Sequence, residues 1–145
     1  MMRFIISFAL SIFVYTPTYA EILKPLQSQN LGYMADVYKT ETFAVDNQAA
    51  RLFAYTGGDP ALNGLYLHIA VMNDDYDWNV YFLKNLNDYQ RLPSAKEGYI
   101  KILLKTDDRV DGMGLITPTT SIMYINLTQA HKVNGKIEVE EIKSK

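Results

Sequence analysis

Two glutamates near the C-terminus are the residues of this sequence whose spacing comes closest to that of a catalytic pair. Glu138 and Glu140 alternate with apolar residues, so on an extended strand they share one face about 7 Å apart. Glycoside hydrolysis needs two acids about 5–10 Å apart that flank the scissile bond. Two side chains on one strand project side by side, not across a sugar. We therefore do not expect this pair to be catalytic.

The other chemically active groups are few. The chain has no Cys and two His, whereas a metal site needs several converging ligands. Residues 107–112 resemble a calcium loop only in part, because Arg109 stands where an oxygen ligand is needed. No serine occupies a nucleophile elbow, and no glycine-rich phosphate loop is present. We predict no enzyme activity, metal or cofactor, and we interpret His68 as a hydrogen-bonded structural residue.

Surface charge is the remaining functional signal. No run of Lys or Arg forms a phosphate-binding stripe and the net charge is −2, so nucleic acid is not an expected partner. Tyr beside acids suits a protein-binding surface, although acids also suit turns and Tyr also suits strands. The acids gather in three clusters: Asp74, Asp75 and Asp77 around Tyr76; Asp107, Asp108 and Asp111; and Glu138, Glu140 and Glu141.

The first 20 residues have the order of a secretory signal peptide. A short basic start that ends at Arg3 precedes an apolar run over residues 4–14, and Thr18-Tyr19-Ala20 fits a cleavage site of small residues. The apolar run is short for a membrane span, and no second run of spanning length follows. The sequence predicts a signal peptide at residues 1–20, one domain at residues 21–145, and no membrane attachment after cleavage. The lack of Cys favours the bacterial periplasm, where domains often fold without disulfides.

The most legible structural element is a hairpin over residues 65–83. Residues 65–72 and 78–83 alternate in polarity on either side of the acidic residues 74–77, which predicts two strands and a turn. We expect this hairpin to be the centre of the core. The side chains expected to face the core are Leu65, Leu67, Ile69, Val71, Trp78, Val80 and Phe82.

The rest of the domain also reads as β-structure. Alternation predicts strands within residues 33–45, 99–105 and 121–127. Residues 48–55 are ambiguous: a strand over residues 52–56 is one alternative, and a short helix that Asp46 would cap, followed by extended chain, is the favoured one. Asn134-Gly135 predicts a type I′ hairpin turn that leads into the last strand. We expect an all-β fold, a two-sheet sandwich or partly open barrel of about seven or eight strands with at most one short helix.

A small, acidic, Cys-free β-domain with a signal peptide resembles the periplasmic immunity proteins that bacteria pair with type VI secretion effectors attacking peptidoglycan. More distantly, it is similar to the periplasmic lysozyme inhibitors. The resemblance is one of overall plan. It implies that the protein binds a cognate peptidoglycan hydrolase and places acidic side chains in its basic cleft. Under this resemblance, the first candidate contact is the last strand, with Glu138, Glu140 and Glu141, and the second is the turn, with Asp74, Asp75, Tyr76 and Asp77.

Two other functions stay open at this point. A barrel interior lined by Tyr66 and His68 would carry a small ligand, because such cavities are apolar with a few convergent polar groups. Alternatively, the domain is a structural subunit of a periplasmic complex, or a homodimer formed by pairing of an exposed strand edge.

Overall fold

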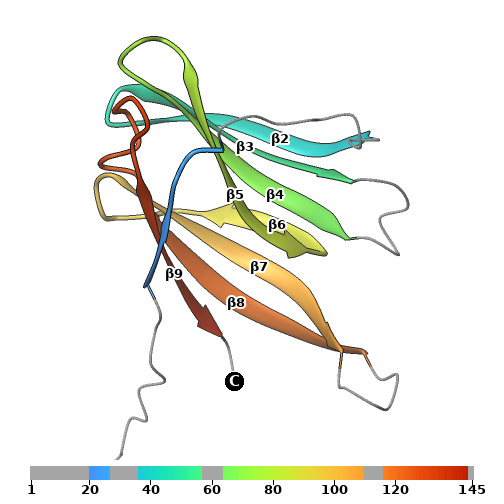
Figure 1. The fold of residues 1–145 in the computed structure, drawn as a ribbon. Coiled ribbons are helices and arrows are strands. Elements are labelled where there is room, and N and C mark those ends of the chain that lie inside the picture. Colours follow the sequence, from blue (N-terminus) through green and yellow to red (C-terminus); the bar gives the residue numbers. More distant parts are fainter. Residues whose placement is uncertain (1–19, 27–35, 57–63, 110–115, 144–145) are drawn as a thin grey trace, which may run out of the picture.

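The computed structural model describes residues 20–26, 36–56, 64–109 and 116–143. The predicted signal peptide, apart from Ala20, and Asp111 lie outside these ranges. The described residues form nine β-strands and no helix (Figure 1). In chain order the strands are β1 (Ala20–Leu23), β2 (Asp36–Val45), β3 (Gln48–Thr56), β4 (Leu65–Met72), β5 (Trp78–Leu86), β6 (Asp88–Leu92), β7 (Tyr99–Arg109), β8 (Ile116–Asn126) and β9 (Ile137–Lys143).

The strands form two antiparallel sheets that pack face to face. The larger sheet has the order β1-β9-β8-β7-β6, and the smaller sheet has the order β2-β3-β4-β5 (Figure 1). One apolar cluster fills the space between them, and its largest members include Leu52, Leu67, Ile69, Tyr81, Ile102, Leu104, Ile125 and Ile137. The predicted β-sandwich is therefore confirmed, and the sheets do not close into a barrel.

The β4–β5 hairpin has the predicted strands, but β5 faces the opposite way from the prediction. Leu65 and the next three alternate residues of β4 are at most 2% exposed, as expected. On β5, however, Tyr81 faces the core, whereas Phe82 is 40% exposed. The reason is register: Met72, on the outward face of β4, pairs with Trp78, and directly opposite residues share a face. Trp78, Val80 and Phe82 therefore lie on the outer surface of the smaller sheet.

The helix predicted for residues 48–55 was wrong. These residues form β3, which pairs with β2 through a tight turn at Asp46 and Asn47. Both turn residues have positive φ, 50° and 65°, and this is the backbone conformation of a two-residue type I′ hairpin. Asp46 therefore serves as a turn residue and not as a helix cap.

The two-residue turn predicted at Asn134-Gly135 was also wrong. Residues 127–136 form a longer loop between β8 and β9, and only Asn134 of the pair has positive φ. The amide of Gly135 donates to the carbonyl of Lys132 at 2.8 Å, so the turn is centred one residue earlier. Gly135 is required because a Cβ there would overlap the carbonyl oxygen of Gln129.

Two strands, β1 and β6, were not predicted, and both lie at an edge of the larger sheet. β1 pairs with β9, and the amide of Leu26 then donates to the carbonyl of Val80 in β5 at 2.8 Å. The segment 20–26 therefore runs from one sheet to the other along this side of the sandwich. On the opposite side, Arg91 of β6 forms an ion pair with Glu41 of β2 at 2.5 Å.

Candidate functional site

The acidic turn, which we define as Asp74, Asp75, Tyr76 and Asp77, joins β4 to β5 at one end of the sandwich. All four residues are exposed, and Tyr76 is 86% exposed, the most of any large apolar or aromatic residue described. Tyr76 also has a φ of 61°. That conformation costs about 1–2 kcal/mol for an L-residue. The surroundings must therefore hold this side chain outward.

Asn73, which is 6% exposed, organises the turn from below. Its Oδ1 accepts hydrogen bonds from the amides of Asp75 and Asp77, each at 3.0 Å. The backbone amide of Asn73 donates to the carbonyl of Asp77 at 2.8 Å, and its backbone carbonyl accepts from the amide of Tyr76 at 3.0 Å. Through its side chain and its backbone, Asn73 thus accepts hydrogen bonds from the amides of Asp75, Tyr76 and Asp77, which makes the turn rigid.

A second buried amide, Asn79, fastens the β8–β9 loop to the same end of the sandwich. Its Nδ2 donates to the carbonyls of Ala130 at 2.8 Å and Lys132 at 2.7 Å, and its Oδ1 accepts from Asn73 at 3.3 Å. The amide of Asp74 also donates to the carbonyl of His131 at 2.8 Å. These bonds join residues 73–77 and residues 127–136 into one unit.

The carboxylates of the acidic turn are not neutralised by the residues that the structure describes. Asp77 accepts a hydrogen bond from the amide of Trp78 at 2.7 Å. No described Lys, Arg or His forms an ion pair with Asp74, Asp75 or Asp77. Three unpaired negative charges within four residues create a local field that favours a positively charged partner.

Glu138 and Glu140 lie on a different surface, the outer face of the larger sheet. They share this face as predicted, opposite Ile22 and Ala20 of β1. Glu138 is exposed and accepts a hydrogen bond from Asn126 at 3.1 Å, whereas Glu140 is half-buried. No described hydrogen bond or ion pair connects either glutamate to the acidic turn. The acidic turn joins two strands of the smaller sheet, so the two predicted contact regions belong to different sheets.

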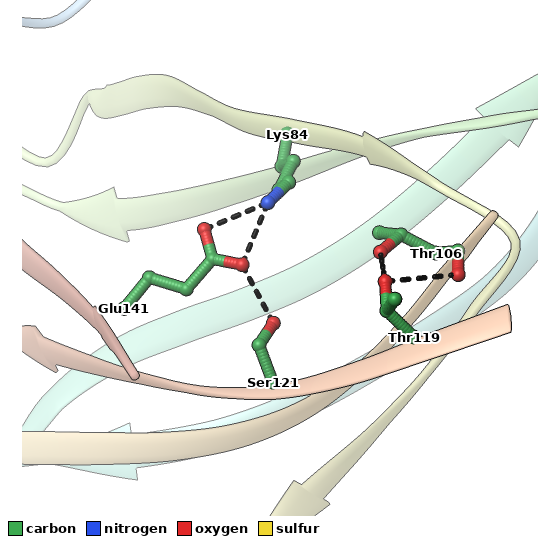
Figure 2. Close-up of polar contacts among 5 residues, drawn as sticks. All are labelled: Lys84, Thr106, Thr119, Ser121 and Glu141. Atoms are coloured by element: carbon green, nitrogen blue, oxygen red, sulfur yellow. Dashed lines mark hydrogen bonds and ion pairs between the residues drawn. The ribbon is translucent and has the colours of Figure 1, made fainter. Parts of the chain in front are cut away.

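Glu141 points the other way, into the sandwich. Its carboxylate accepts hydrogen bonds from Lys84 Nζ at 2.6 and 2.7 Å and from Ser121 Oγ at 2.6 Å (Figure 2). Figure 2 also shows a neighbouring pair, Thr106 and Thr119, whose hydroxyls are 2.8 Å apart. Burial raises the pKa of Glu141, but the bonds from Lys84 and Ser121 and the nearby positive charges outweigh it and leave the pKa lowered. The geometry makes Glu141 a link between the two sheets.

We expect this link to weaken in acid. Because the folded-state pKa of Glu141 lies below its ordinary value of 4.5, its contribution is complete above pH 4.5 and is lost as the pH falls toward the folded-state pKa. Near pH 7, Glu141→Gln should lower the free energy of unfolding by about 1.5–3 kcal/mol. Urea unfolding of both proteins across pH should show this difference shrinking below pH 4.5. A difference that stays constant would contradict the assigned ion pair.

A further surface, which the sequence reasoning missed, lies on the outer face of the smaller sheet. His68 stacks on Phe53 at 5.3 Å and on Tyr55 at 5.0 Å, measured between ring centroids, and contacts Phe82 at 5.2 Å. Its Nδ1 lies 3.3 Å from the carbonyl of Tyr66. Burial lowers the pKa of His68, and the hydrogen bond to Tyr66 only partly opposes this.

The expectation that Tyr66 and His68 line an internal cavity was wrong, since they lie on this outer face. A hollow with a volume of about 340 Å³ opens on the same face. Its lining residues are Val37, Thr40, Arg51, Phe53, Ala70 and Trp78. The signal in the sequence was the second set of alternating residues in β3 and β4, whose side chains point away from the core.

The described residues offer no cluster of three or more His, Asp or Glu that could hold a metal ion. Within the same ranges, no helix has the length and apolar character needed to cross a membrane.

The fold and these surfaces define the class of protein: an antiparallel two-sheet β-sandwich with a rigid acidic turn at one end. Comparison with known proteins found no matching family model, curated protein sequence or solved structure.

Proposed function

We propose that this protein is a periplasmic protein-binding inhibitor of the immunity-protein kind, which blocks a peptidoglycan-hydrolase effector. The acidic turn is the main contact, and Glu138 and Glu140 form a second one. The observation that carries the proposal is Tyr76: a large aromatic side chain, 86% exposed and held at a positive φ. It is flanked by three carboxylates that form no ion pair with any residue in the described ranges. Export through the signal peptide at residues 1–20 is part of the same proposal.

The rigidity of the turn favours binding. Ordering a loop on association consumes free energy, so a turn already fixed by Asn73 and Asn79 loses little on binding. Backbone strain in native proteins also gathers at functional positions. A fixed, exposed Tyr is therefore suited to be an energetic anchor of an interface, where aromatic residues dominate.

The charge of the turn sets the kind of partner. Asp74, Asp75 and Asp77 would accelerate association with a hydrolase whose substrate cleft is basic, and they would disfavour acidic partners. Glu138 and Glu140 lie on a separate face, so they can contact only another part of the same partner or a second molecule. Glu141 is left out of the contact because its carboxylate is engaged by Lys84 and Ser121.

Tyr76→Gly tests the anchor without disturbing the fold. Gly adopts positive φ at no steric cost, so the thermal melting temperature should stay the same or rise. Binding to the cognate hydrolase, for which a secreted hydrolase encoded next to this gene is the first candidate, should weaken at least about 30-fold, as expected for an interface hot spot. A thermal melt measures the first effect, and calorimetric titration together with a cell-wall lysis assay measures the second.

Charge reversal then separates the two proposed contacts. Asp74→Lys combined with Asp75→Lys should slow association strongly and reduce its salt dependence. Glu138→Lys combined with Glu140→Lys is the matched variant on the other face. Unchanged affinity in that second variant would remove the larger sheet from the interface. Unchanged affinity in Tyr76→Gly and in the first double variant would contradict the proposed function itself.

A further inference from the structure

The hollow on the outer face of the smaller sheet is formed by residues from all four of its strands. Val37 and Thr40 come from β2, Arg51 and Phe53 from β3, Ala70 from β4 and Trp78 from β5. Most of the lining atoms are apolar, and the charged group is the guanidinium of Arg51. Trp78 directly follows Asp77, so the hollow borders the acidic turn, whereas the Glu138–Glu140 face belongs to the other sheet.

A small residue among large ones accounts for the depression. Ala70 pairs with Arg51 on one side and with Val80 on the other, and His68 and Met72 are the next outward residues along β4. Because Ala has no side chain beyond Cβ, this row of outward residues is lowest at Ala70, which is 6% exposed and forms the floor of the hollow. Phe53, which stacks on His68 at 5.3 Å between ring centroids, and Trp78 form the walls.

Arg51 gives the hollow its chemical preference. Its guanidinium carbon lies 5.5 Å from the centre of the Trp78 ring, and Arg51 is exposed. Among the described residues it makes no ion pair, whereas Arg91 on the inner side pairs with Glu41. A guanidinium presents a planar fork of donors that fits a carboxylate in two hydrogen bonds. An unpaired fork beside an apolar wall suits an anion that also has an apolar body.

We propose that this hollow binds a small amphipathic carboxylate, such as a medium-chain fatty acid. The apolar chain would lie in the gap over Ala70 against Phe53 and Trp78, and the carboxylate would meet Arg51. The volume of about 340 Å³ is at the lower end of the range for small-molecule sites, about 300–1,000 Å³. It therefore suits a single short chain.

The tryptophan in the wall makes the test direct. Trp78 is the one Trp of the chain, so its fluorescence reports on the hollow. We expect sodium octanoate, titrated well below its micelle-forming concentration, to produce a saturable change in emission. Octanol, which has the same chain without the charge, should bind at least about ten-fold more weakly, because a charge-assisted hydrogen bond is lost. Octylammonium should bind no more tightly than octanol.

Two variants make the assignment specific. Arg51→Gln should remove the preference for octanoate over octanol, and Ala70→Leu should fill the gap and block both probes. Lys101→Gln, on the outer face of the larger sheet, is the matched control and should behave as the wild type. Circular dichroism establishes that each variant is folded. The absence of a saturable change with octanoate, or a preference for octanoate that survives Arg51→Gln, would overturn the proposal.

Discussion

Replacing Tyr81 by Ala should lower the free energy of unfolding by about 3–5 kcal/mol. Tyr81 is fully buried, and its hydroxyl donates to the carbonyl of Gly135 at 2.7 Å. Burial raises the pKa of that hydroxyl to about 12, although the hydrogen bond with Asn79 opposes the shift. The phenol therefore stays protonated and keeps its bond to the β8–β9 loop at any physiological pH. The variant would lose both the core packing and this bond.

Trp78→Ala is the matched comparison for this prediction. Trp78 is half-buried on the outer face of the smaller sheet, so its loss should cost about 1 kcal/mol. Urea unfolding followed by circular dichroism measures both variants without depending on the Trp signal. A greater loss of stability in Trp78→Ala than in Tyr81→Ala would mean that β5 faces the core with the residues first predicted.

Gly135→Ala is expected to be the most damaging change in a loop, with a loss of about 3 kcal/mol or more. A Cβ at this position would overlap the carbonyl oxygen of Gln129 and lie 2.9 Å from that of Lys132. Both are backbone atoms, which cannot rotate away as a side chain can. The loop would have to move, and the bond from Tyr81 to Gly135 would move with it.

The control for this loop is Asn134→Gly. Asn134 has a φ of 54°, which Gly adopts readily, so the change should alter stability by no more than about 0.5 kcal/mol. If Asn134-Gly135 were a two-residue type I′ turn, Gly135 would be needed for a positive φ and not for space. Gly135→Ala would then cost much less stability. Thermal melts that rank Gly135→Ala as mild would contradict the observed loop.

The class of fold could be predicted from alternation alone, but the facing of β5 could not. Period-2 patterning shows that residues 78–83 are extended without showing which half of them meets the core. Apolar side chains occur on both faces here, because Trp78, Val80 and Phe82 cover the outside while Tyr81 fills the inside. The register of β5 against β4, including the irregularity beside Leu67 and His68, decides the outcome.

The candidate sites could also be predicted only in part. The acidic turn is contiguous in sequence, so its composition and exposure could be predicted, but the buried amides of Asn73 and Asn79 that fix it could not. The hollow could not be predicted from the sequence, because its lining residues come from four different strands. Only the paired register brings Arg51 of β3 and Trp78 of β5 to either side of Ala70.

The pairing of β1 with β9 affects the order in which the two sheets form during folding. β1 and β9, the first and last of the described strands, are neighbours, so β1 can join the larger sheet only after β9 has been synthesised. Contacts between such distant segments form slowly, since a long loop must close before they do. The larger sheet is therefore completed late in folding, whereas the strands of the smaller sheet, β2 to β5, pair with their neighbours along the chain and need no such long loop.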